Sequence, residues 1–334
     1  IQRAHQDESL WVSHAPESLV VRGSESSPAR LDTPIYRDLY APYDICDTMT
    51  LNLTYDHQVM ALLTLYRTQA ELAGGVCVEV PTYANEAWAI DEARLRAAIT
   101  PRTKLIVFNN PCNPTGMVYD AGQLRALADV CVRHDLYVIA DEIYYKLLYD
   151  GLEFTSFAAL GDEVKERTII INGVSKSYAM TGWRIGYAAS NKQLAKVMSN
   201  YLSHSTGAPS TISQWAAVEA LNGPQEGIEA MRKIFEERRN YLVSRLNSID
   251  GVSCITPNGA FYVMMNIEKL IGRTLGGRLI ENDDDFGVAF LEKGLVAVVP
   301  CSGFGIKNFV RWTYATSMEN IKEGLDRLEK FLAE

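Results

Sequence analysis

The sequence has too few clustered cysteines and histidines for a metal site or a disulfide framework. Its six cysteines are scattered along 334 residues without C-x-x-C spacing, and its five histidines form no ligand pattern. We therefore expect reduced thiols and no zinc site. Long apolar runs are also missing, since none approaches the roughly 20 residues that span a bilayer. The opening IQRAHQDESL is too polar for a signal peptide, so we expect a cytoplasmic protein with no membrane partner.

The chain is also short of positive charge. Its 32 lysines and arginines stand against 41 acidic residues, which gives a formal net charge of −9. This balance argues against a nucleic-acid partner, because proteins that bind nucleic acid normally present a basic face. The 47% hydrophobic and 22% charged residues are ordinary for a soluble globular protein. The first residue is Ile1 rather than Met, which is compatible with a missing natural amino terminus.

Short apolar runs alternate with a helical pattern in the middle of the chain. Residues 105–108, 136–140 and 168–172 have the composition of buried strands, and residues 184–189 indicate another. Between the first two runs, residues 121–135 repeat apolar side chains at helical spacing. This strand–helix–strand rhythm predicts an α/β fold with a parallel sheet and right-handed crossovers.

The pattern changes after about residue 190. Long helical stretches are followed by alternating strand-like and helical segments, which predicts a smaller α+β domain. The strand-like segments are residues 259–267, 296–300 and 309–315, and the helical ones are residues 283–295 and 318–332. The glycine-rich, charged stretch at residues 272–285 is expected to be an exposed loop.

The length suits one large and one small domain. Residues 1–65 form an irregular segment without sustained periodicity. Residues 66–190 are predicted to form the large domain, and residues 191–334 the interdomain helices and the small domain. No internal repeat is present.

Three candidate motifs follow the ends of three successive predicted strands. NNPCNPTG at residues 109–116 follows the first strand, Asp141 follows the second, and Lys176 lies just past the third. The carboxyl ends of parallel strands share one edge of a sheet, and ligands bind along that edge. Residues far apart in the sequence are therefore expected to converge on one site.

The residue types suit defined chemistry at such an edge. Partial desolvation beyond a buried strand lowers the pKa of a lysine, which favours covalent chemistry at the Lys176 amine. Asp141 offers a carboxylate suited to a protonated pyridine nitrogen, and Arg184 offers a fork of donors suited to a phosphate. Asn113 and Tyr144 are neutral donors suited to a ring oxygen.

Each residue also has a simpler interpretation. Lys176 alone is typical of a solvated surface charge, Asp141 could cap the following segment, and NPTG is a good turn sequence. Arg311 could grip a carboxylate with two parallel hydrogen bonds, but Arg184 and Arg311 could equally be edge charges that discourage aggregation. Their occurrence in order, at strand ends and with complementary charges, favours a site.

Three segments resemble the signature segments of class I aminotransferases, which are enzymes of the pyridoxal 5'-phosphate (PLP) fold type I. They are NNPCNPTG, ADEIYYK and INGVSKSYAMTGWRIGYAAS, and the last is the most specific. The resemblance covers about residues 72–334 and is closest to the bacterial aspartate-aminotransferase-like subgroup. It implies a mostly parallel sheet with helices on both faces and a smaller carboxyl-terminal α+β domain.

The resemblance also implies a role for each candidate residue that would contact the cofactor ring. Lys176 would carry PLP and shuttle a proton between the substrate and the cofactor. Asp141 would pair with the pyridine nitrogen and keep it protonated. Tyr144 and Asn113 would form hydrogen bonds to the phenolic oxygen of the cofactor.

The remaining candidates are assigned to charged groups. By the same resemblance, Ser175 and Arg184 would hold the cofactor phosphate. Arg311, with help from Asn113, would bind the substrate α-carboxylate. A homodimer is implied too, because active sites of the family borrow residues from the partner chain.

The amino-terminal part departs from the family pattern. Members carry a glycine-rich turn that grips the phosphate at a helix N-terminus, and an aromatic residue that stacks on the pyridine ring. RGSES at residues 22–26 and APY at residues 41–43 are only faint echoes of these features. A divergent segment, a loss of part of this region, or an aberrant reading of the gene would each explain the difference, and we favour loss or aberration.

The leading functional hypothesis is amino transfer between an L-amino acid, either aspartate or an aromatic one, and a 2-oxo acid in amino-acid biosynthesis. A PLP-dependent C–S lyase would use the same residues and would be recognised by its products, pyruvate and a thiol. A degenerate, non-catalytic homologue would fit the unusual amino terminus. A borohydride-reducible link to PLP at Lys176 would exclude it.

Overall fold

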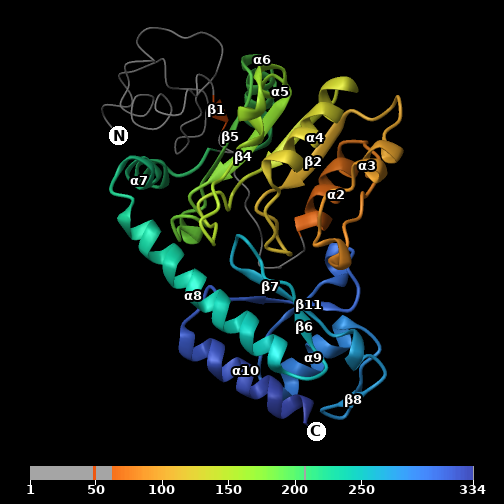
Figure 1. Ribbon diagram of the computed structural model, residues 1–334. Coiled ribbons are helices and arrows are strands. Elements are labelled where there is room, and N and C mark those ends of the chain that lie inside the picture. The colour runs from red at the N-terminus through yellow and green to blue at the C-terminus, as the bar shows by residue number, and fades with distance from the viewer. Residues whose placement is uncertain (1–47, 50–61, 207, 334) are drawn as a thin grey trace.

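The computed structural model describes residues 48–49, 62–206 and 208–333, with side chains from residue 66 onward. Two sheets organise this part of the chain, and the long helix α8 (Glu226–Ser248) leads from beside the larger sheet along the smaller one (Figure 1). The expectations for residues 1–47 and 50–61, including the two faint echoes of family motifs, lie outside the described residues. No helix in the described part is long and apolar enough to cross a membrane.

The larger sheet has five strands in the order β1-β5-β4-β3-β2. Its strands are β1 (Thr48–Met49), β2 (Leu105–Asn109), β3 (Tyr137–Asp141), β4 (Thr168–Gly173) and β5 (Gly186–Ala189). The pairs β2–β3 and β3–β4 are parallel, whereas β5 runs antiparallel to both β4 and β1. The predicted α/β class is confirmed, but the parallel part consists of three strands only, because residues 184–189 return along β4.

The crossover helix between β2 and β3 forms where the periodicity predicts it. This helix, α4 (Ala121–Arg133), begins with a capping box in which Asp120 and Gln123 satisfy each other's backbone N–H groups. Its apolar stripe, including Leu124 and Cys131, is buried in the core of the larger sheet. The other helices beside this sheet are α2 (Leu62–Leu72), α3 (Glu92–Ala98), α5 (Asp162–Lys165), α6 (Lys192–Ser205) and α7 (Thr211–Asn222).

The smaller sheet has four strands in the order β10-β11-β7-β6. They are β6 (Ser253–Cys254), β7 (Tyr262–Asn266), β10 (Val299–Pro300) and β11 (Phe309–Thr313), and all are antiparallel. The helices α9 (Asp283–Gly294) and α10 (Met318–Leu332) pack here, and α10 also contacts α8. This arrangement matches the predicted α+β pattern, and the closing helix is stabilised by burial of Leu325 and Leu328.

Two sequence expectations are wrong in detail. The glycine-rich stretch at residues 272–285 is not simply a loop, since it contains the hairpin of β8 (Thr274–Leu275) and β9 (Arg278–Leu279). The strands are too short to leave a periodic signal. Strand β2 is also not fully buried, because Leu105 and Val107 are 42% and 37% exposed at the edge of the sheet.

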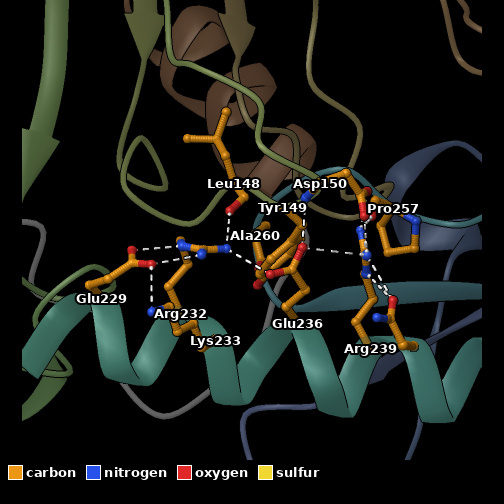
Figure 2. A network of polar contacts seen from close by, with 11 residues as sticks. Leu148, Tyr149, Asp150, Glu229, Arg232, Lys233, Glu236, Arg239, Pro257 and Ala260 are labelled. Carbon is orange, nitrogen blue, oxygen red and sulfur yellow. Dashed lines mark hydrogen bonds and ion pairs between the residues drawn. The ribbon is translucent and has the colours of Figure 1, made fainter.

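A polar network fastens α8 to the loop that follows β3 (Figure 2). Arg239 is 1% exposed, and its two terminal nitrogens contact the Asp150 carboxylate at 2.6 and 2.7 Å. The same guanidinium donates to the Pro257 carbonyl at 3.0 Å. About two turns earlier on α8, Arg232 donates to the Leu148 carbonyl at 3.2 Å. The helix therefore holds the loop beyond the candidate site against the start of the smaller sheet.

Candidate active site

Asp141 ends β3 and is 5% exposed. One carboxylate oxygen accepts a hydrogen bond from the Ile143 backbone N–H at 3.1 Å, and the other accepts from the Tyr66 hydroxyl at 2.6 Å. The Asp141 carbonyl accepts from the Asn109 side chain at 2.8 Å and the Asn110 N–H at 2.9 Å. The ends of β2 and β3 are thereby tied together, and the carboxylate is fixed at the sheet edge.

Lys176 lies on the turn beyond β4 and is partly buried. Burial is the largest influence on its amine and lowers the pKa, and the positive charges of Arg184 and Arg311 lower it further. The negative charge of Asp141 raises the pKa of this amine. The Asp141 pKa is raised, mainly by burial, while Tyr66, the Ile143 N–H and Lys176 oppose the rise. Lys176 and Asp141 therefore share one edge of the sheet and affect each other electrostatically.

Arg311 comes from β11 of the smaller sheet and meets Asn113 from the loop beyond β2. Its guanidinium donates to the Asn113 side-chain oxygen at 2.6 Å, and the Asn113 N–H donates to Asn109 at 2.7 Å. The guanidinium also lies over the rings of Tyr262 and Phe304, at 4.3 and 5.3 Å from their centroids. The two aromatic rings and the Asn113 side-chain amide thus hold the Arg311 guanidinium where the two sheets meet.

The other predicted residues surround the same position. Tyr144 is buried after β3, and its hydroxyl lies 3.0 Å from the Tyr262 hydroxyl. Ser175 directly precedes Lys176 and is partly buried. Arg184 is exposed, adopts a left-handed backbone conformation, and donates to the Thr181 carbonyl at 2.8 Å. Its charge still lowers the Lys176 pKa, so Arg184 lies close enough to Lys176 to act on the amine.

Sequence reasoning missed three residues of this region. Tyr66 lies on α2, before the first recognisable motif, and nothing in the surrounding LLTLYRTQAEL marks it. Tyr262 begins β7, in a segment that the sequence predicted only as strand-like. Glu142, the neighbour of Asp141, is 3% exposed, and burial raises its pKa to about 7. The sequence did contain a signal for Glu142, because it is a titratable residue directly after an aspartate at a predicted strand end.

The donor set fits PLP. A buried carboxylate and two guanidinium groups lie close enough to the Lys176 amine to influence its pKa. These groups match the aldehyde, the ring nitrogen, and the negatively charged phosphate and carboxylate of a PLP–substrate pair. Among the described residues, no group of three or more His, Cys, Asp or Glu side chains could hold a metal ion.

Comparisons with known proteins agree with this geometry. A profile of the family described as aminotransferase class I and II matches residues 64–328. An aspartate aminotransferase of Geobacillus stearothermophilus is 46% identical over 267 residues, which are 80% of this chain and 67% of that protein. The solved aspartate aminotransferase of Rhizobium meliloti superposes with a TM-score of 0.77 at 41% identity, over 81% of this chain and 68% of that one.

A solved aromatic aminotransferase of Pyrococcus horikoshii OT3 also superposes with a TM-score of 0.77, at 34% identity, over 86% of this chain and 79% of that one. The chain belongs to the class I and II aminotransferase family. It is accordingly a PLP-dependent transaminase of fold type I.

Proposed function

We propose that this transaminase moves the amino group between an L-amino acid, aspartate or an aromatic one, and a 2-oxo acid, with Lys176 carrying the cofactor. The observation that supports this most directly is the placement of Asp141 and Lys176 at the ends of the neighbouring parallel strands β3 and β4, where each charge influences the pKa of the other group. The substrate class is supported by similarity to proteins named aspartate aminotransferase and aromatic aminotransferase.

Each residue contributes a defined step. The lowered pKa gives Lys176 a larger fraction of neutral amine near pH 7, which favours attachment of the cofactor and later removal of the proton from the substrate α-carbon. Bound PLP supplies a ring that withdraws electrons from that carbon. Asp141 would hold the ring nitrogen in its protonated form, and Asn113 and Tyr144 would hold the phenolic oxygen. Ser175 and Arg184 would bind the phosphate.

Arg311 is proposed to orient the substrate by its α-carboxylate. The guanidinium is already fixed by Asn113 and by the rings of Tyr262 and Phe304, so little conformational freedom is lost when a carboxylate binds. A planar fork of donors suits this two-point recognition. Every amino acid and 2-oxo acid carries the group, which is consistent with a reaction that must accept both.

We further infer a cytoplasmic homodimer with a role in amino-acid biosynthesis, made of a large domain at residues 66–190 and a small part at residues 191–334. Similarity to the bacterial transaminases named above supports this inference. The two sheets have their own main cores, which supports two domains, although Tyr144, Leu147 and Tyr149 of the first range pack in the core of the smaller sheet. Sedimentation of the purified chain at several concentrations measures the assembly state directly.

The test of the function compares the purified chain with Lys176→Ala and Lys146→Ala. Lys146 is a suitable control, because it is also partly buried and its amine donates to Gln225 at 3.0 Å. After PLP addition and borohydride reduction, peptide mapping should find the cofactor on Lys176. Formation of a new 2-oxo acid should be lost in Lys176→Ala and retained in Lys146→Ala. A link at another lysine, or equal activity in both variants, would contradict the proposal.

A further inference from the structure

The Tyr66 hydroxyl and the Asp141 carboxylate are 75 positions apart in the sequence and 2.6 Å apart in space. An ionised carboxylate can only accept hydrogen bonds, so the phenol is the donor. Bonds of this kind to a charged acceptor are shorter and stronger than neutral ones. We propose that Tyr66 is a positioning residue that fixes the Asp141 carboxylate toward the cofactor ring nitrogen, an inference that rests on the proposed function.

The hydrogen bonds to the two oxygen atoms of Asp141 show that the Tyr66 contact orients the carboxylate. One oxygen is held by the Ile143 N–H and the other by Tyr66, so both rotation and tilt of the carboxylate are restrained. Each carboxylate oxygen has room for a second hydrogen bond. The pinned group therefore retains acceptor capacity for a ring N–H while it is held from two directions.

The helix that carries Tyr66 is itself anchored to the site. α2 packs against the short 3-10 helix η9 (Ser302–Phe304), whose Phe304 ring lies beside Arg311. Arg67 also ties α2 to the following segment through an ion pair with Glu79 at 3.0 Å, in addition to a pair within the helix with Glu71 at 3.4 Å. Tyr66 thus connects the carboxylate of the larger sheet to a helix that contacts the substrate-binding side.

The charge states of the two groups support the same assignment. Burial raises the Asp141 pKa, and the Tyr66 hydrogen bond is the largest influence that lowers it again. Burial and the Asp141 charge together raise the Tyr66 pKa far above its usual range, so the phenol keeps its proton at any physiological pH. Tyr66 is therefore a permanent donor that favours the ionised form of its partner.

The test is Tyr66→Phe in the full chain, with Tyr119→Phe as the matched control. Tyr119 is another partly buried tyrosine, and its ring packs against Phe108 in the core of the larger sheet. We expect the dissociation constant for PLP, measured by absorbance titration, to rise about tenfold in Tyr66→Phe and to stay unchanged in Tyr119→Phe. The pH below which PLP affinity is lost should also move upward in Tyr66→Phe, because Asp141 then protonates more readily.

A measurement on the cofactor-free protein separates this inference from the proposed function. The infrared band of the protonated Asp141 carboxyl, assigned by its loss in Asp141→Asn, should persist to higher pH in Tyr66→Phe. Unshifted titration of that band, or equal PLP affinity, would overturn the positioning role while leaving the function intact. Tighter PLP binding would overturn it too, since the phenol would then compete with the ring. If the unaltered chain fails to bind PLP, the function fails and the infrared result still decides the contact.

Discussion

Glu142 follows Asp141 directly in the chain and is buried with it, yet the two carboxyl groups have different partners. Asp141 faces the candidate site, whereas one Glu142 oxygen accepts from the Ser156 hydroxyl at 3.0 Å and from the Phe157 N–H at 2.9 Å. Burial nevertheless dominates and raises the Glu142 pKa to about 7. A structural carboxyl beside the site therefore changes charge within the physiological range.

The stability of the cofactor-free protein should depend on pH through Glu142. The folded protein keeps this proton up to about pH 7, whereas the unfolded chain loses it near its ordinary pKa of 4.5. The folded state thus binds more protons in this window, and the free energy of unfolding should fall as pH rises through it. Glu142→Gln keeps the acceptor oxygen and should become more stable than the unaltered chain by up to about 3 kcal/mol above pH 7.

Urea denaturation at pH values between 5 and 8 measures this difference. The exposed Glu163→Gln is the matched control and should run parallel to the unaltered chain at every pH. A stability gain for Glu142→Gln that is independent of pH would show that charge burial is not its cause.

Site residues at the ends of strands could be predicted from the sequence. Site residues contributed by other elements, such as a helix, could not. Lys176 and Asp141 follow apolar runs, and parallel strands place such residues on one edge whatever the intervening sequence. Tyr66 reaches the same carboxylate from a helix, and no local pattern records a contact across 75 positions. Only packing of the whole chain determines it.

At the scale of elements, long segments were predictable and short ones were not. The helices α4, α9 and α10 begin and end close to the expected residues, because each buries a periodic apolar stripe. The direction of β5 was not predictable, since an apolar run of four residues looks the same whether it pairs parallel or antiparallel. The hairpin of β8 and β9 is shorter still and depends on tertiary contacts.

The network on α8 gives a prediction at this scale. Asp150→Asn removes the charge that balances the buried Arg239 but retains a residue that tolerates the left-handed backbone at this position, where φ is 59°. Since a nearly inaccessible guanidinium keeps only the more distant Glu236, at 4.0 Å, as a counter-charge, we expect a loss of about 2–3 kcal/mol in unfolding free energy. Chemical denaturation provides the measurement.

Asp129→Asn is the comparison for this experiment. Asp129 is 3.9 Å from Arg133, and both side chains are more than 60% exposed, at 68% and 64% respectively. Such surface pairs contribute about 0.5 kcal/mol or less. Equal losses in the two variants would mean that burial of Arg239 has no energetic consequence.

At the scale of the whole molecule, the site depends on how the two sheets are joined. The NPTG turn beyond β2 forms this joint, because the Gly116 carbonyl accepts from the Asn258 N–H at 3.0 Å and the Gly259 N–H at 2.7 Å. The same loop carries Asn113 to Arg311. The sequence indicated a turn here, but the contact with residues 258–259 arises only when both sheets are folded.

Gly116 is required at this joint for two reasons. Its φ is +67°, and a Cβ atom would lie 2.4 Å from Pro257 Cβ and 2.9 Å from the Tyr262 carbonyl oxygen. Gly116→Ala should therefore lose at least about 3 kcal/mol of unfolding free energy. It should also weaken binding of a 2-oxo acid, because the sheets that hold Asn113 and Arg311 are pushed apart.

Gly151→Ala isolates the backbone contribution. Gly151 has a φ of +71°, and nothing lies within 4 Å of its added Cβ atom. Thermal and urea denaturation should show a loss of about 1–2 kcal/mol for this variant, which reflects conformation alone. Indistinguishable values for the two alanine variants would argue against a steric joint at Gly116.

The exposed edge strand β2 of the larger sheet has a consequence for how the protein behaves in concentrated solution. Among the described strands, β2 pairs with β3 alone, and its half-exposed Leu105 and Val107 leave an apolar ribbon beside unpaired backbone groups. An exposed edge strand of this kind can pair with a strand of another chain, which leads to aggregation. Mutual repulsion from the net charge of −9 opposes that pairing, so added salt, which screens the repulsion, should promote self-association into aggregates.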